Sequence, residues 1–142
     1  MAEAVRVELG DWAAVRSRAE PVRRAVFVDE QKVPAEIELD EFDAVSLHAL
    51  AFDRAGRVIG TGRLLPDGHI GRMAVLRQAR GAGVGGAVLA ALMQAARARG
   101  DREVVLSAQT HAMPFYRRFG FVAEGDEYDD AGIPHRAMRL VF

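Results

Sequence analysis

The residues with the clearest chemical meaning lie in a glycine-rich stretch over positions 77–86. It contains two arginines and four glycines, namely Arg77, Arg80, Gly81, Gly83, Gly85 and Gly86. Glycine lets the backbone approach a bound group without an intervening Cβ. The first N–H groups of a helix have no internal partner, so they can bind an anion, and arginine adds charge-assisted donors. The pattern predicts a diphosphate site at the start of a helix.

The same stretch could instead be a tight turn that needs glycine only for geometry, or one of two further nucleotide-binding motifs. A Walker A loop ends in Gly-Lys-Ser/Thr, whereas alanine and valine follow Gly86. Gly81, Gly83 and Gly86 do match the dinucleotide pattern G-x-G-x-x-G. That fold also needs an acidic residue at the end of the next strand, where this chain has Gln109. A plain turn needs only one or two glycines, so we favour the diphosphate site.

The surrounding sequence predicts the elements that position this turn. Alternating and turn-bounded patterns predict strands over 5–9, 47–53, 57–65, 69–75, 103–108, 121–124 and 136–141, the last two flanking a turn over 129–134. Helices are predicted over 83–99 and 112–119 and from Pro21 to about Glu30, with a turn or short helix over 11–16. We expect strand 103–108 to lie parallel to strand 69–75. The order gives an α+β fold in α/β/α layers, with one βαβ unit in a mixed, mainly antiparallel central sheet.

One predicted strand carries an unusual pair of glycines. Gly60 and Gly62 lie on the same face of strand 57–65, together with Val58 and Leu64. Glycine weakens a strand, so its presence predicts that another element comes close to the backbone there.

Length, charge and composition exclude several classes of protein. The 142 residues suit one domain, which we expect to span 1–142. No cysteine is present, which excludes disulfides, thiolate metal sites and cysteine nucleophiles, and no His, Asp or Glu spacing suggests a metal. The net charge of −1 differs from the basic excess of a non-specific nucleic-acid binder. Residues 1–6 lack the apolar core of a leader, and no uncharged stretch reaches about 18 apolar residues, so we expect a soluble, cytoplasmic protein without a membrane partner.

The segment Gln78-Ala-Arg-Gly-Ala-Gly83 resembles the Q/R-x-x-G-x-G/A signature of the GNAT superfamily of N-acetyltransferases. The strand before it, the helix after it and the later segment FYRRFGF at 115–121 are similar to that family as well. Pieces typical of the narrower ElaA/YjcF-like branch lie at residues 25–31, 48, 71–75, 108–111 and 132–135. The resemblance covers the chain from about residue 25 to the end.

The resemblance implies a GNAT fold with acetyl-CoA as cosubstrate. In that fold the strands matching 69–75 and 103–108 splay apart, and the cofactor enters the gap. The implied cofactor-binding residues are Met73, Ala74 and Val75 on the strand, for the pantetheine arm, and Arg80, Gly81, Ala82, Gly83, Val84, Gly85 and Gly86 for the diphosphate. A backbone N–H near 73–75 would stabilise the oxyanion that forms when an amine attacks the thioester.

The resemblance also suggests which side chains move protons. Tyr116 matches the family's general acid, since a phenol with a pKa near 10 keeps its proton at neutral pH and can give it to the CoA thiolate. The alternative is that Tyr116 only packs beside Phe115 and Phe119. Glu30 and His111 are the candidate bases.

Further candidates stay open beside these. Glu41, Asp43 and His135 could also accept a proton, and each candidate base could instead be a surface or structural residue. Gln31, Arg63, Arg72 and Gln109 either shape the acceptor site or tie the sheet together.

The sequence therefore predicts an acetyl-CoA-dependent N-acetyltransferase that acts on an amine of a small molecule, peptide or protein by direct attack on the thioester. One rival is a non-catalytic acyl-CoA-binding or regulatory protein of the same fold. The other is a scaffold domain in which the glycine stretch is only a turn. A homodimer is one option for the assembly.

Overall fold

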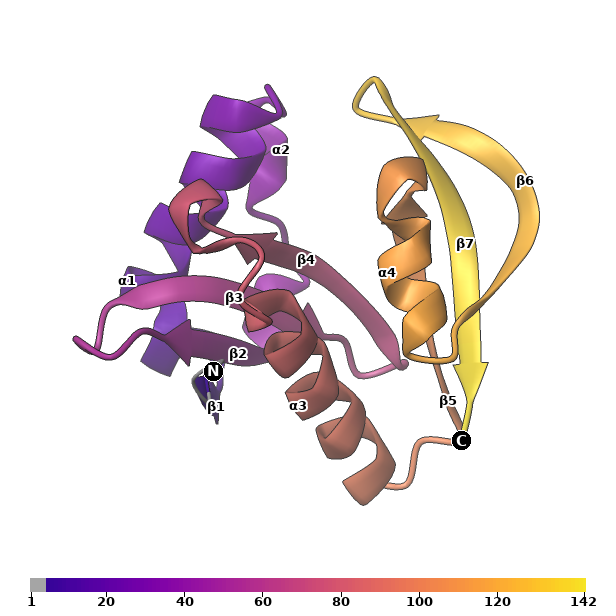
Figure 1. Cartoon of the computed structure of the whole chain (residues 1–142), viewed down its shortest axis with the longest axis horizontal. Helices are drawn as coiled ribbons and strands as arrows, with labels where there is room; N and C mark the ends of the chain where they lie inside the picture. The colour runs from indigo at the N-terminus through magenta and orange to yellow at the C-terminus, as the bar shows by residue number, and fades with distance from the viewer. Residues whose placement is uncertain (1–4) are drawn as a thin grey trace.

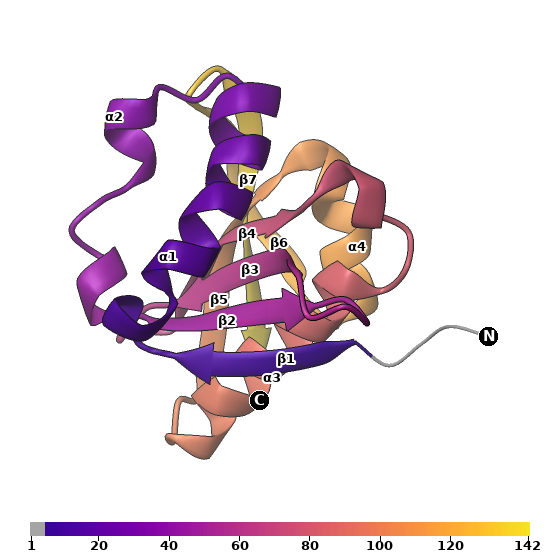
Figure 2. The same cartoon turned by 90° about the vertical axis from the view of Figure 1, so that its left-hand side faces the viewer.

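A seven-stranded sheet forms the centre of the molecule in a computed structural model that describes residues 5–142 (Figures 1 and 2). Its strands are β1 (Arg6–Gly10), β2 (Leu47–Phe52), β3 (Val58–Leu64), β4 (His69–Val75), β5 (Glu103–Gln109), β6 (Val122–Asp130) and β7 (Ile133–Val141), in the order β1-β2-β3-β4-β5-β7-β6. Among the strands of residues 5–142, only β4 and β5 pair in parallel. The predicted α+β sheet with one βαβ unit is confirmed. Residues 1–4, where the sequence predicts no leader, lie outside the described residues.

The helical segments are α1 (Trp12–Arg23), the π-helix η1 (Arg24–Glu30), α2 (Ala35–Glu38), α3 (Val84–Ala98) and α4 (Met113–Arg118), with short 3₁₀ turns η2 (Asp43–Val45), η3 (Arg77–Ala79) and η4 (Thr110–Ala112). None of the described helices has the length and apolar character needed to cross a membrane. The predicted helix start at Pro21 is wrong, because α1 already begins at Trp12 and Pro21 lies inside it. The lost N–H of Pro21 is tolerated because Val15, Ala19 and Val22 are buried along one side.

The side chains of β2 alternate between two cores on opposite faces of the sheet. Leu50 and Phe52 pack with Val15 and Ala19 of α1. Ala49 and Ala51 face the larger core, which α3 builds with Val84, Val88, Leu89 and Leu92. Figure 2 shows α1 in front of the sheet and α3 behind it.

Helix α3 lies unusually close to β3, as the two glycines predict. A Cβ added to Gly60 would come within 2.8 Å of Val84 Cγ1, and one on Gly62 within 2.9 Å of Val88 Cγ1. Real Cβ atoms are essentially never found so near to another atom. The predicted close approach is confirmed.

The two central strands separate soon after they meet. Parallel pairing between β4 and β5 is limited to His69 with Val105 and Ile70 with Leu106. Beyond this point β4 also carries a bulge opposite β3, where Arg72 has a φ of 47°. The separation leaves the second half of β4 facing the end of β5 across an opening.

The hairpin of β6 and β7 is longer than the sequence predicts. The expected turn over 129–134 shrinks to Ala131 and Gly132, with φ angles of 53° and 79°. Two successive positive φ angles give a turn whose twist matches that of the strands, so pairing continues to the tip. The tip stands beside the opening between β4 and β5.

Candidate active site

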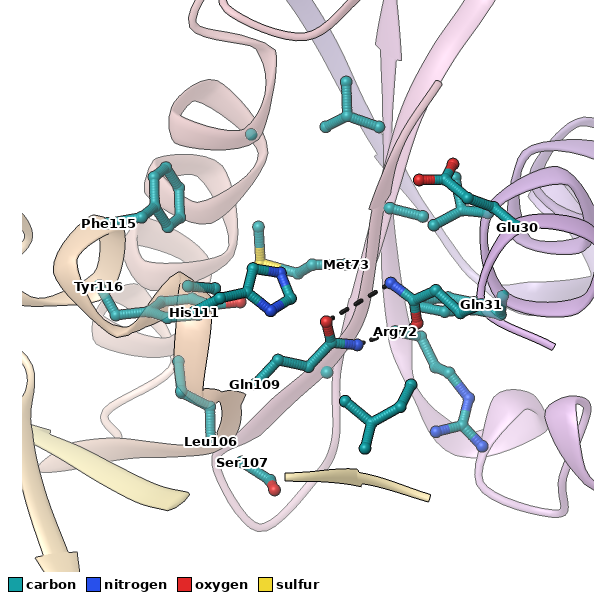
Figure 3. A pocket seen from close by; sticks show the side chains of 18 of the residues that line it. Glu30, Gln31, Arg72, Met73, Leu106, Ser107, Gln109, His111, Phe115 and Tyr116 are labelled. Carbon is teal, nitrogen blue, oxygen red and sulfur yellow. Dashed lines mark hydrogen bonds between the residues drawn. The ribbon is translucent and has the colours of Figure 1, made fainter. Parts of the chain in front are cut away.

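A cleft of about 870 Å³ occupies the opening between β4 and β5. One wall comes from η1, α2, β4 and the turn before α3, and the other from β5, η4, α4 and the β6–β7 hairpin (Figure 3). The predicted residues that line it are Met73, Ala74, Val75, Arg80, Gly81, Gly83, Val84, Gly85, Gly86, Glu30, His111 and Tyr116. Ala82 belongs to the same turn but does not line the cleft. Residues far apart in the sequence are thus brought together.

The turn before α3 has the geometry expected for binding an anion. Gly81 and Gly83 have φ angles of 85° and 81°, which side-chain-bearing residues rarely adopt, and Gly83 is the N-cap of α3. No side chain caps this end, and the first helical hydrogen bond runs from the Ala87 amide to the Gly83 carbonyl, at 3.0 Å. The amides of residues 84–86 therefore have no partner within the helix. A Cβ on Gly81 or Gly83 would meet nothing within 4 Å, so a bound group has room beside this backbone.

Arg80 is held at the same end of the cleft by three hydrogen bonds. Its Nη1 and Nη2 donate to the two carboxylate oxygens of Glu30, at 2.7 and 2.8 Å, and its Nε donates to the Val75 carbonyl at 3.1 Å. Arg77 lies 3.7 Å from the same carboxylate. The hydrogen bonds from Arg80 are the main cause of a lowered pKa of Glu30. A carboxylate so held binds a proton weakly, which argues against Glu30 as the base.

Tyr116 lies on α4 with its ring among other aromatic side chains. The ring centroids of Phe115 and Phe121 are 5.1 and 6.0 Å away. Burial raises the pKa of Tyr116 to about 12, so the phenol keeps its proton throughout the neutral range. Tyr116 can therefore pack among the aromatic rings and still donate a proton. It lies on the side of α4 that faces the cleft (Figure 3).

A pair of glutamines bridges the cleft between its two walls. Gln109 at the end of β5 donates through Nε2 to Oε1 of Gln31, at 2.9 Å, and Gln31 returns a longer contact of 3.5 Å. Figure 3 shows this pair crossing the middle of the cleft. The sequence leaves open whether these glutamines shape the acceptor site or hold the sheet together. The geometry is compatible with both roles, because each glutamine lines the cleft and their hydrogen bonds join its two walls.

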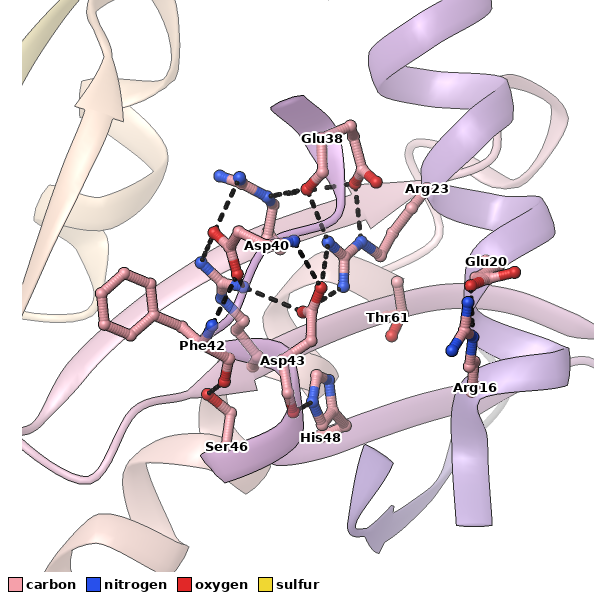
Figure 4. Close-up of polar contacts among 12 residues, drawn as sticks. Arg16, Glu20, Arg23, Glu38, Asp40, Phe42, Asp43, Ser46, His48 and Thr61 are labelled. Carbon is pink, nitrogen blue, oxygen red and sulfur yellow. Dashed lines mark hydrogen bonds and ion pairs between the residues drawn. The ribbon is translucent and has the colours of Figure 1, made fainter. Parts of the chain in front are cut away.

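Arg63 and Arg72 belong to a largely buried ionic network beside the cleft. Figure 4 shows its members Arg23, Glu38, Asp40 and Asp43. The network joins three arginines to three carboxylates: Arg23, Arg63, Arg72, Glu38, Asp40 and Asp43. Burial alone would raise the pKa of Asp43, but Arg23 and Arg63 lower it. Asp43 is fully enclosed here and does not line the cleft, and neither does the exposed Glu41. The network fixes the acidic segment to the sheet.

The two histidine candidates differ in their surroundings. His111 is exposed at the cleft, on η4. His135 is buried, with its Nδ1 2.7 Å from the Ile133 carbonyl and its ring stacked on Tyr128. Of the two, His111 has the more open access to a bound acceptor.

Several lining residues were not singled out from the sequence. They include Ile37, Glu38, Ser107, Arg118 and Asp130. Ser107 could have been found from the alternation of β5, because its neighbours Leu106 and Ala108 point into the core. Ile37 and Glu38 lie on α2, which is a single helical turn and too short to show a helical repeat of apolar residues in the sequence. Among residues 5–142, no group of three His, Asp or Glu side chains could hold a metal ion.

Comparison with known proteins places the chain in a family. The family model described as "Acetyltransferase (GNAT) domain" matches residues 14–142. The chain is 45% identical over 121 residues to the uncharacterized N-acetyltransferase YjcF of Bacillus subtilis, covering 82% of this chain and 86% of that protein. It is 31% identical to the protein ElaA of Escherichia coli over 125 residues, with coverage of 82% and 81%.

Solved structures agree with the sequence relatives. An acyl-CoA N-acyltransferase from Pseudomonas aeruginosa superimposes with a TM-score of 0.84 at 34% identity, covering 96% of this chain and 99% of that one. The crystal structure of Escherichia coli ElaA gives a TM-score of 0.83 at 26% identity, with the same coverage.

Proposed function

Since the chain belongs to the GNAT acetyltransferase family, in its ElaA/YjcF-like branch, we propose that it transfers an acetyl group from acetyl-CoA to a primary amine. Acyltransfer from a CoA thioester is the activity of the family. The choice of the acetyl group and of an amine on a small molecule, peptide or protein is our proposal for this chain. Its main support is the glycine turn before α3, which lines the cleft and leaves the amides of residues 84–86 without a partner within the helix.

The donor would lie along β4 with its diphosphate at the turn before α3. The amides of Val84, Gly85 and Gly86 and the side chain of Arg80 would hold the diphosphate, because they combine the positive end of the helix with charge-assisted donors. The backbone of Met73, Ala74 and Val75 would hold the pantetheine arm, because β4 has no partner strand over these residues on the side of β5.

Tyr116 would act when the thioester breaks. The amine nitrogen would first bond to the carbonyl carbon and form a tetrahedral oxyanion. When this intermediate collapses, the C–S bond breaks and the phenol proton of Tyr116 passes to the departing thiolate sulfur. A backbone N–H in the bulged part of β4 would stabilise the intermediate oxyanion. The amine gives its own proton to His111, directly or through water, since Glu30 is engaged with Arg80.

The proposal is tested by measuring CoA binding and product formation separately. Calorimetric titration with CoA should show saturable binding to the wild-type chain. Release of free CoA from acetyl-CoA should then depend on an added amine across a panel of small amines and peptides. Binding without amine-dependent release would identify a non-catalytic acyl-CoA-binding protein, and absence of binding would leave the glycine turn without a ligand role.

A further inference from the structure

The segment over residues 37–45, from the end of α2 through η2, buries two carboxylates and exposes its large apolar side chains. Glu38 and Asp43 are only 4% and 2% exposed. Its large apolar residues are instead exposed, by 53% for Ile37, 38% for Leu39, 46% for Phe42 and 59% for Val45. A solvent-facing segment normally has the opposite pattern, since carboxylates are almost never buried unless they are paired. We call these four apolar residues the outer strip.

The buried ionic network holds the outer strip in this orientation. Arg23 donates to Glu38 at 2.6 Å and to Asp43 at 2.6 Å, while Arg63 donates to Asp43 at 2.9 Å. Arg72 adds a hydrogen bond from its Nε to the Glu38 carbonyl, at 3.0 Å. Turning the apolar side chains inward would expel these paired charges or leave them unpaired, which is strongly unfavourable. The strip is therefore a fixed surface.

The outer strip begins inside the cleft and continues beyond it. Ile37 lines the cleft, whereas Leu39, Phe42 and Val45 follow along the segment outside it. An acceptor small enough to fit inside the cleft beside the donor would not reach Phe42. The strip therefore suits an acceptor that is longer than the cleft.

The charges around the strip indicate the sign of such an acceptor. Arginines neutralise Glu38, Asp40 and Asp43 on the inner side. The outward carboxylates of Glu36 and Glu41 are exposed next to the strip, and Asp130 is exposed on the opposite rim of the cleft. A positively charged chain would be attracted to the exposed carboxylates beside the strip.

We propose that the acceptor is an amine on a peptide or protein whose neighbouring residues are apolar and basic, and that these residues dock on the outer strip. The inference rests on the proposed function and narrows its acceptor to one class. The amine would enter the cleft beside Ile37, and the apolar residues next to it would cover Leu39 and Phe42.

Direct binding of labelled peptides tests whether an acceptor docks on the outer strip, and it does not require turnover. The two probes are ten-residue fluorescein-labelled peptides, each with one lysine amine, flanked by leucine and arginine in one and by serine and glutamate in the other. Anisotropy is measured with CoA present, for the wild type and for Ile37→Ser, Phe42→Ser and Val141→Ser. Val141 is 69% exposed on β7 and does not line the cleft, so its variant controls for the loss of an exposed apolar side chain.

We expect the leucine–arginine peptide to bind the wild type at least tenfold more tightly than the serine–glutamate peptide. Ile37→Ser and Phe42→Ser should each weaken that binding by roughly fivefold to tenfold, because few apolar contacts carry most of an interface. Val141→Ser should leave it unchanged. CoA titration and acetylation of a small amine should be the same in the wild type, Phe42→Ser and Val141→Ser, because neither Phe42 nor Val141 lines the cleft.

Equal affinity for both peptides, or no loss in the two strip variants, would overturn the inference while CoA binding still supports the proposed function. Sedimentation velocity is run on the same proteins. A wild-type dimer that Phe42→Ser dissociates would also overturn the inference, because a second copy of the chain would then occupy the strip. If the wild type fails to bind CoA, the proposed function itself fails, and that result is distinct from the other two.

Discussion

Arg80 and Glu30 form a two-point ion pair at the end of the cleft where the glycine turn begins, with distances of 2.7 and 2.8 Å between nitrogen and oxygen. Arg80 comes from the connection between β4 and α3, and Glu30 is the last residue of η1, fifty positions away in the sequence. A predicted anion-binding arginine thus already carries a carboxylate as its counter-ion. The same contact accounts for the lowered pKa of Glu30.

Replacing Glu30 by glutamine should strengthen CoA binding. Glu30→Gln removes a negative charge beside the diphosphate site but keeps one oxygen for Arg80, whose Nε bond to Val75 also remains. We expect the dissociation constant to fall about threefold to tenfold at low salt, with the gain shrinking as salt screens the charges. Calorimetry over a salt series measures this. Glu124→Gln, which alters an exposed pair with Arg139, is the control, and weaker binding in Glu30→Gln would refute the prediction.

The hydroxyl of Tyr116 should matter for turnover but not for binding. Tyr116→Phe keeps the ring packing with Phe115 and Phe121 and removes only the proton donor. We expect kcat to fall by roughly 10²-fold or more, with an unchanged CoA dissociation constant. Because the pKa of Tyr116 is raised to about 12, the wild-type rate should not decline from loss of this proton below pH 10. Steady-state rates measured against pH test this, and a decline below pH 10 caused by loss of the Tyr116 proton would contradict the assignment.

Gly83 should be needed for ligand binding beyond its contribution to stability. Gly83→Ala and Gly56→Ala place a methyl group at the same φ of 81°, and neither Cβ meets an atom within 4 Å. Both should destabilise the fold by about 1 kcal/mol, because positive φ disfavours alanine. Only Gly83→Ala should weaken CoA binding, by roughly tenfold, because its methyl group enters the space beside the turn. Urea unfolding and CoA titration compare the two, and equal CoA affinity would contradict a site here.

Removing Arg23 should be far more costly than removing an exposed arginine. Arg23→Met leaves Glu38 and Asp43 buried with fewer partners, which is expected to cost about 3–5 kcal/mol of unfolding free energy. Arg16 pairs with Glu20 at the same distance of 2.6 Å, but its side chain is 58% exposed. Arg16→Met should cost less than about 1 kcal/mol. Urea denaturation measures both variants, and equal losses of unfolding free energy in Arg23→Met and Arg16→Met would show that the network contributes little to stability.

Acid should destabilise the fold in two stages. Burial lowers the pKa of His48, whose Nε2 bonds to the Asp43 carbonyl at 2.9 Å, so below about pH 6.5 the unfolded chain binds this proton more strongly. Asp40 and Asp43 also have lowered pKa values in the fold, so a second loss begins below about pH 4. Unfolding free energies between pH 3 and pH 8 measure both. His48→Gln should flatten the curve just below about pH 6.5 and leave the lower stage.

Much of the fold could be predicted because local patterns and tertiary packing agree. Helix α3, predicted over 83–99, is observed at Val84–Ala98, since its apolar stripe and its flanking glycines mark the same limits. The two glycines of β3 correctly indicated a close neighbour. The start of α1 was missed because Pro21 suggested a first turn, whereas burial of Val15 and Ala19 keeps the helix going through it.

The candidate site was predicted best where backbone geometry depends on residue type. The glycine turn needs positive φ, which the sequence can show, and its position at the cleft follows from the order of strand, turn and helix. The partners of charged side chains were out of reach, because they come from distant segments. Glu30 lies on η1 and Asp43 on η2, and their pairing with Arg80 and with Arg23 and Arg63 depends on how these segments pack against β4 and α1.

The absence of side chains at Gly60 and Gly62 on β3 restricts which substitutions the protein can accept. Val84, which would collide with a Cβ at position 60, is the first residue of α3 and directly follows the N-cap Gly83. Any enlargement at position 60 pushes outward on the helix end that carries the amides of the turn. Mutational libraries that select for altered donor affinity should therefore return substitutions at a buried strand position with no atom in the cleft. Substitutions in β3 are therefore restricted by their effect on ligand affinity as well as by their effect on folding.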